Sequence, residues 1–181
     1  MSATRTQLTM EDLERIPDDG MHREILWGEL ILLPPPKIEH ANIARLIFKH
    51  LDAHVEKRAL GKAYIEAGYK LSSGSGTWLQ PDVSFLSKER LRKSGYVVGA
   101  PEVAFEIISP SESASDIESK NAAYFQAGAT AVVLVFDKTR TVRVCSSNGV
   151  MQTLREGEIL SLPEVLPGWE LAVATIFSEA D

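Results

Sequence analysis

Cysteine is scarce and long apolar runs are missing from this chain of 181 residues. Cys145 is the only cysteine, so no internal disulfide can form, which agrees with the reducing cytoplasm where we expect the protein to work. No apolar run approaches the roughly 18 residues that a membrane-spanning helix needs. Residues 1–7 have no apolar core of the signal-peptide type. We therefore expect a cytoplasmic protein that makes no contact with a membrane.

An excess of positive charge is also missing. The chain has 19 Lys and Arg residues against 25 Asp and Glu residues, a formal net charge of −6. This balance argues against binding nucleic acid through overall charge alone. It leaves room for a local basic patch, or for a carboxylate site whose divalent cation reverses the local field.

The remaining composition is that of an ordinary soluble globular protein, with 44% hydrophobic and 24% charged residues. The length favours a single domain over residues 1–181. A domain of this size buries roughly 70% of the surface of its unfolded chain, so it needs no disulfides to be stable.

The first part of the chain predicts two helices and several strands. An acid three residues after a threonine cap predicts a short helix over 9–16. Residues 23–33 have a strand–turn–strand pattern. Apolar residues at helical spacing predict a helix over 40–60, with Gly61 as its stop. Residues 63–71 read as one strand.

The middle of the chain predicts a parallel crossover. Two apolar strands near 82–86 and 102–108 each carry an acid. The capping box Ser115-Asp116-Ile117-Glu118 predicts a helix that runs to about residue 127. A buried strand over 131–136 follows. A strand, a helix and a strand in this order form one crossover unit, so the strands at 102–108 and 131–136 should be parallel.

The last part of the chain predicts antiparallel hairpins. Strands over 141–145 and 151–154 flank a turn at Asn148-Gly149, and a final strand lies near 170–174. The whole pattern predicts an α/β fold, a mixed sheet with helices packed on it.

Two carboxylates lie in apolar strands, where a charge is costly. Glu106 sits inside the run 103–108, and Asp82 follows Pro81 at the start of the other run. A buried charge is unfavourable alone, so such residues are usually paired or bound to a metal. Metals of the magnesium class take one or two carboxylates together with water and substrate phosphate. If the two strands are neighbours, Asp82 and Glu106 predict a site for Mg²⁺ or Mn²⁺.

Lys120 should reach the same place from the following helix. It lies three residues after Ile117 and four before Tyr124, so the three share one stripe that faces the sheet. An ammonium beside two carboxylates could hold an attacking water or stabilise charge that develops on phosphorus. With a metal that lowers the pKa of that water, this is the chemistry of phosphodiester hydrolysis.

Each of these residues also has a purely structural explanation. Asp82 could open its strand and accept backbone hydrogen bonds. Glu106 could be half of a structural ion pair. Lys120 could pair with Asp116 on the solvent side of its helix. The three residues together are more specific for a site than any one of them.

Other polar groups near the predicted site are less specific. A basic cluster lies between the two acid strands, where it forms either a solvated loop or a rim that contacts phosphates; it comprises Lys88, Arg90, Arg92 and Lys93. His40 stands near the start of the helix over 40–60, where it either begins the helix or contacts substrate.

Pro81-Asp82 followed by Glu106 on a strand is similar to the signature of PD-(D/E)XK nucleases. Over about residues 8–177 the chain resembles the Uma-two family of bacterial restriction-endonuclease-like proteins. The resemblance rests on Trp27-Gly28-Glu29-Leu30, Leu33-Pro34-Pro35-Pro36 with His40, Gln80-Pro81-Asp82-Val83, Ala100-Pro101-Glu102-Val103-Ala104-Phe105-Glu106-Ile107-Ile108-Ser109-Pro110-Ser111, then Asp116, Lys120, Tyr124, Gly128 and Leu166-Pro167-Gly168-Trp169-Glu170-Leu171.

This resemblance implies a restriction-endonuclease-like fold, a mixed sheet with flanking helices and antiparallel hairpins. It implies that Asp82 and Glu106 are metal ligands and that the backbone carbonyl of Ile107 supplies a third oxygen. The nuclease signature has lysine two residues after the glutamate, where this chain has Ile108. The family resembles nucleases whose lysine has moved to the next helix, and Lys120 occupies that place.

The resemblance also implies a further acid upstream, which is common in the superfamily. Glu29 is the first candidate and Glu24 the second.

Three functions are compatible with these observations. The leading expectation is a Mg²⁺-dependent or Mn²⁺-dependent endonuclease whose partner is nucleic acid, with DNA favoured; a homodimer would suit cleavage of both strands. The second is a non-catalytic binding or assembly module that retains the nuclease fold, which the acidic net charge favours. The third is a hydrolase that uses the same acids on another phosphoester.

Overall fold

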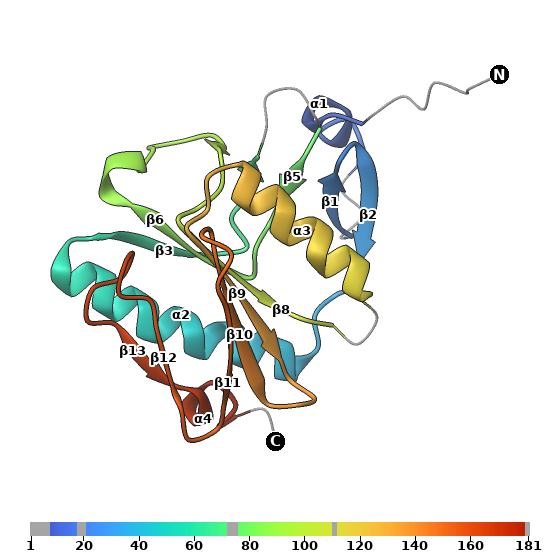
Figure 1. Ribbon diagram of the computed structural model, residues 1–181. Helices are drawn as coiled ribbons and strands as arrows, with labels where there is room; N and C mark the ends of the chain where they lie inside the picture. Colours follow the sequence, from blue (N-terminus) through green and yellow to red (C-terminus); the bar gives the residue numbers. More distant parts are fainter. Residues whose placement is uncertain (1–7, 18–20, 72–75, 110–111, 180–181) are drawn as a thin grey trace.

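The computed structural model describes residues 8–17, 21–71, 76–109 and 112–179. Two long helices and two main sheets dominate it (Figure 1). The helices are α1 (Met10–Leu13), α2 (Ile38–Arg58), α3 (Ala114–Gln126) and α4 (Val173–Ile176), with one 3-10 turn, η1 (Lys88–Arg90). The strands are β1 (His22–Leu26), β2 (Glu29–Leu33), β3 (Gly61–Ile65), β4 (Tyr69–Lys70), β5 (Trp78–Leu79), β6 (Val83–Ser87), β7 (Val97–Val98), β8 (Val103–Ile107), β9 (Ala131–Phe136), β10 (Thr141–Ser146), β11 (Met151–Arg155), β12 (Ile159–Ser161) and β13 (Glu170–Ala172).

The larger sheet holds both acid-bearing strands at its centre. Its strand order is β11-β10-β9-β8-β6-β3. Strand β8 pairs antiparallel with β6 and parallel with β9. The predicted neighbour relation and the parallel crossover through α3 are therefore confirmed. Strands β10 and β11 form the predicted antiparallel hairpin.

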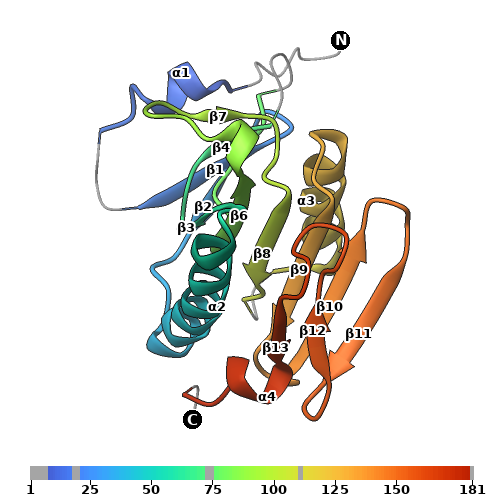
Figure 2. The same ribbon diagram turned by 90° about the vertical axis from the view of Figure 1, so that its left-hand side faces the viewer.

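Alternate residues of β8 face two different cores. Val103, Phe105 and Ile107 pack in the core that α2 covers. Ala104 packs in the other core, with residues of α3, and strand alternation places Glu106 on that same face. Figures 1 and 2 show α2 and α3 on opposite sides of β8 and β9. The helix that carries Lys120 thus covers the face that carries Glu106, as predicted.

A smaller sheet packs on the α3 side of the larger one. Its order is β2-β1-β5-β4-β7, and Leu26, Tyr69 and Leu79 from this region share a core with Ala123 and Tyr124 of α3. Strand β1 is internal to this sheet and β2 is an edge strand.

The prediction of one strand over 63–71 is wrong, because the chain passes from one sheet to the other there. Strand β3 belongs to the larger sheet and β4 to the smaller one. Between them Glu66 adopts a left-handed conformation with φ of 49°. At Gly68 a Cβ would lie 2.6 Å from the Trp78 ring, so only glycine lets the chain pass beneath that ring.

Helix α2 ends near the predicted place, but through a different residue. Ala59 takes the left-handed conformation that closes the helix, with φ of 53°. Gly61 is instead the first residue of β3. A Cβ at this position would lie 2.1 Å from the carbonyl oxygen of Leu86 in β6, so the position requires glycine. The demand for glycine at this position comes from sheet packing.

The cap of α3 lies two residues earlier than predicted. Ser113, and not Ser115, accepts the backbone N–H of Asp116, and Asp116 accepts the N–H of Ser113 in return. The predicted cap of α1 by Thr9 is confirmed, with Asp12 completing the box.

The predicted strand near 170–174 is shorter, because β13 is followed directly by α4 and pairs with β12 in a two-stranded sheet. Pro110 and Ser111, at the end of the segment that most resembles the family, lie outside the described residues. No helix among the described residues is both long and apolar enough to cross a membrane.

Candidate active site

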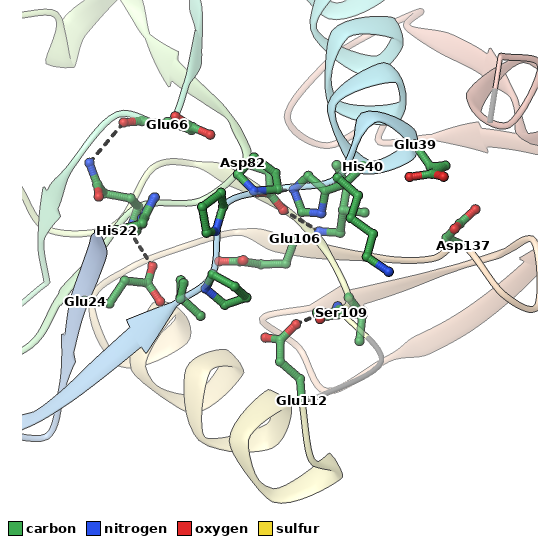
Figure 3. A pocket seen from close by; sticks show the side chains of 18 of the residues that line it. His22, Glu24, Glu39, His40, Glu66, Asp82, Glu106, Ser109, Glu112 and Asp137 are labelled. Atoms are coloured by element: carbon green, nitrogen blue, oxygen red, sulfur yellow. Dashed lines mark hydrogen bonds and ion pairs between the residues drawn. The ribbon is translucent and has the colours of Figure 1, made fainter. Parts of the chain in front are cut away.

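A pocket of about 390 Å³ lies where the start of β6, the end of β8, strand β1 and the start of α2 meet. Seven acidic side chains and three lysines line it, so its walls carry a surplus of negative charge. Figure 3 shows the carboxylates of Glu24, Asp82 and Glu106 gathered in it, with His40 beside Asp82. The three residues predicted for catalysis, Asp82, Glu106 and Lys120, all belong to its lining.

Asp82 is held by two hydrogen bonds at the start of β6. Its Oδ1 lies 2.8 Å from Nε2 of His40, and its Oδ2 accepts the backbone N–H of Ile107 at 2.6 Å. Burial acts to lower the pKa of His40, but the hydrogen bond to Asp82 and its charge outweigh burial and raise that pKa. Asp82 therefore accepts a backbone hydrogen bond, as the structural explanation predicted, while its side chain lines the pocket.

Glu106 is a buried carboxylate with one neutral and one charged neighbour. Its side chain accepts a hydrogen bond from the hydroxyl of Tyr124 at 2.5 Å, and its Oε2 lies 3.8 Å from Nζ of Lys120. Burial raises the pKa of Glu106 well above its usual range, although Lys120 acts to lower it. The negative charges of Glu24 and Asp82 raise it further. Positive charge in the pocket would stabilise the ionised form.

Lys120 is buried and lies among three carboxylates. Its Nζ is 2.8 Å from Glu24, 3.8 Å from Glu106 and 3.7 Å from Glu112. Burial acts to lower the pKa of Lys120, but these charges raise it above the ordinary value, so the ammonium is retained. The alternative of a solvent-side pair with Asp116 is wrong, because Asp116 caps α3 instead.

Of the two upstream candidates, the structure places Glu24 in the pocket lining and Glu29 outside it. Glu24 on β1 has no exposed surface and lines the pocket. Glu29 begins the edge strand β2, is exposed, and does not line the pocket. The first candidate for this role is thus misplaced and the second is in position, because an internal strand buries side chains that an edge strand leaves in solvent.

The basic cluster between the acid strands lies outside the pocket lining. Arg90 donates to the carbonyl of Ala100 at 2.6 Å and lies 3.4 Å from Glu102, so it ties down its own loop. The other three residues are exposed, and they are Lys88, Arg92 and Lys93. The structure therefore does not bring the predicted phosphate contacts to the acids. Besides Lys120, the basic residues of the lining are Lys37 and Lys138.

Sequence reasoning missed one partner of Lys120 and one partner of Glu106. Glu112 directly precedes the cap of α3, and its carboxylate lies 3.7 Å from Nζ of Lys120. Tyr124 was placed on the inward stripe with no role, although its spacing of four residues from Lys120 was the available signal. His40 was considered for a substrate contact, and its hydrogen bond to Asp82 joins residues 42 apart in the chain.

The donor atoms fit a hard divalent cation. Asp82 and Glu106 offer carboxylate oxygens. Ile107 donates its N–H to Asp82, so its carbonyl points toward the same strand edge. Among the described residues no three His, Cys, Asp or Glu side chains are grouped to hold a metal by themselves. Magnesium-class ions commonly take one or two carboxylates and complete their shell with water and substrate oxygens.

The mixed sheet with its flanking helices has a restriction-endonuclease-like fold. The chain belongs to the Uma2 family, whose model, described as "Putative restriction endonuclease", matches residues 10–174. The predictions of family and fold class are confirmed.

A solved structure with the same fold is a crystal structure titled as a "putative nuclease belonging to DUF820" from Anabaena variabilis ATCC 29413. The two chains are 18% identical, the TM-score is 0.83, and the match covers 96% of this chain and 99% of the other. No curated protein matches the chain.

Proposed function

We propose that this protein is a metal-dependent endonuclease that hydrolyses phosphodiester bonds of DNA. The observation that carries the proposal is the convergence of Asp82, Glu106 and Lys120 in one pocket of a Uma2-family chain. Each comes from a different element, so local sequence alone does not explain their meeting.

The residues of the pocket divide the work. Asp82, Glu106 and the carbonyl of Ile107 would hold Mg²⁺ or Mn²⁺, which would supply an activated water and neutralise charge on the phosphate. Lys120 presents a retained ammonium beside Glu106, where it can orient a water or stabilise charge that develops on the phosphoryl oxygens. Tyr124 fixes the carboxylate of Glu106 through its hydroxyl.

Changing Asp82 tests the proposal directly. The variant Asp82→Asn should lose Mg²⁺-dependent or Mn²⁺-dependent cleavage of DNA by at least about 100-fold, because it removes a charge that the metal requires. The measurement is cleavage of a labelled plasmid and a labelled oligonucleotide. Asp52→Asn on α2, outside the pocket lining, is the matched control and should retain activity. Unchanged cleavage by Asp82→Asn would show that the site lies elsewhere.

A second candidate is a non-catalytic binding module that keeps the nuclease fold. One observation favours it: both oxygens of Asp82 are engaged within the protein, by His40 and by Ile107. Calorimetric titration with Mn²⁺ separates the two candidates. Absence of binding at millimolar Mn²⁺, together with unchanged behaviour of Glu106→Gln, would favour the module.

A further inference from the structure

Glu24 lies on the smaller sheet, but it contacts two parts of the candidate site: the segment before Asp82 and the helix that carries Lys120. It lies on β1 of the smaller sheet and is fully buried. A buried carboxylate is stable only with partners for its charge and its oxygens. Glu24 therefore has to be accounted for by the groups around it.

The two oxygens of Glu24 have different partners. Oε1 accepts the backbone N–H of Gln80 at 2.8 Å, and Gln80 stands two residues before Asp82. Oε2 lies 2.8 Å from Nζ of Lys120. One rigid carboxylate thus ties the segment that carries Asp82 to the helix that carries Lys120.

Glu24 is also the nearest of the three carboxylates around Lys120. Glu106 and Glu112 are about one ångström farther from the ammonium, at 3.8 and 3.7 Å. Loss of the negative charge at Glu24 would leave the ammonium free to close on Glu106. That movement would bring the ammonium onto an oxygen that the proposed metal requires.

We propose that Glu24 is a positioning residue. Its carboxylate holds the Lys120 ammonium beside Glu106 and links it to the segment that carries Asp82. This inference rests on the proposed function. It differs from a metal-ligand role for the upstream acid, since Oε1 of Glu24 accepts a backbone N–H and Oε2 lies in an ion pair with the Lys120 ammonium.

The contact itself is tested by a cycle of stability measurements, which needs no activity. The variants are Glu24→Gln, Lys120→Met and the double variant, and the readout is the melting temperature. Each single change should lower the Tm, because each leaves a buried charge without its nearest partner. The Tm of the double variant should exceed the additive value by at least about 2–4 °C. Additive shifts would overturn the inference.

The positioning role is tested by kinetics and metal binding. Glu24→Gln should lower kcat by roughly 10–100-fold while KM for an oligonucleotide stays within about twofold, because a misplaced group costs rate and not affinity. The double variant should be no slower than Lys120→Met alone. Glu29→Gln, an exposed change on the same hairpin, is the matched control and should match the wild type.

Titration with Mn²⁺ separates this inference from its rival. The affinity of the double variant for Mn²⁺ should stay within about twofold of that of Lys120→Met, because neither variant has an ammonium that could close on Glu106; a fall of about tenfold or more between the two would identify Glu24 as a metal ligand and overturn the inference. If the wild type cleaves no DNA, the proposed function fails. The Tm cycle and the Mn²⁺ titration then still decide whether Glu24 holds Lys120.

Discussion

At the scale of single residues, the buried charged side chains of the site have different numbers of charged partners. Lys120 has three carboxylates within 4 Å, whereas the charge of Glu106 faces one ammonium at 3.8 Å and the hydroxyl of Tyr124. Hydrogen bonds to an ionised group are stronger than those between neutral groups. The Tyr124 hydroxyl should therefore contribute more to stability than an ordinary buried hydroxyl.

Removing that hydroxyl gives a residue-scale prediction. Tyr124→Phe should lower the free energy of unfolding by about 1.5–3 kcal/mol, because a buried carboxylate loses its donor. It should also raise the pKa of Glu106, since the hydrogen bond from Tyr124 acts to lower it. The measurement is urea unfolding at about pH 9, above the raised pKa of Glu106, where the carboxylate is ionised.

Tyr69→Phe is the matched control for this prediction. Tyr69 is also fully buried, but its hydroxyl shares a hydrogen bond with a neutral group, the hydroxyl of Ser84, at 2.8 Å. The loss there should be about 0.5–1.5 kcal/mol. Equal losses for the two variants would contradict a charge-assisted bond at Glu106.

At the scale of elements, α3 matters most for the site because it delivers two groups from adjacent turns. Lys120 and Tyr124 are four residues apart and both are buried toward β8. The stripe that includes them could be predicted from spacing alone. The first residue of the helix could not, because two serines each have an acid three residues later.

The cap of α3 gives a prediction at this scale. Ser113→Ala should lower the free energy of unfolding by about 1 kcal/mol, since it removes the acceptor for the N–H of Asp116. Ser115→Ala, on the exposed first turn of the same helix, should change stability by less than about 0.5 kcal/mol. Thermal unfolding of both variants measures the difference. A larger loss of stability in Ser115→Ala would indicate that Ser115 caps the helix, as the sequence pattern predicted.

At the scale of the whole molecule, the net negative charge of the chain and the acidic lining of the pocket both disfavour the approach of DNA. The net charge is −6, and seven acidic side chains line the pocket against three lysines. A phosphodiester backbone is itself a polyanion, so these walls repel it. A divalent cation bound by the carboxylates would reverse the local field.

This charge balance predicts that DNA binding depends on divalent cations. For the cleavage-impaired variant Lys120→Met, affinity for an oligonucleotide duplex should rise at least about tenfold between chelator and millimolar Mg²⁺. Fluorescence anisotropy measures this change. Sodium chloride at matched ionic strength is the control, because salt alone weakens contacts to phosphate. Equal affinity with and without Mg²⁺ would contradict a metal-bridged substrate.

Much of the candidate site was predictable because its signals are local. Glu106 and Asp82 stand out as charges in apolar strands, and Lys120 stands out on an inward stripe. The choice between Glu24 and Glu29 was not predictable, because both lie on one hairpin and differ in which strand becomes internal. That depends on the pairing of β1 with β5, far along the chain.

The sequence by itself determined the two long helices, the acid-bearing strands, the parallel crossover and the faces of β8 and α3, because each follows from periodicity over a few residues. Tertiary structure alone decided what the acids touch. The contacts of His40 with Asp82 and of Gln80 with Glu24 join residues 42 and 56 positions apart. Such contacts depend on how two sheets and two helices pack, and no local pattern records that packing.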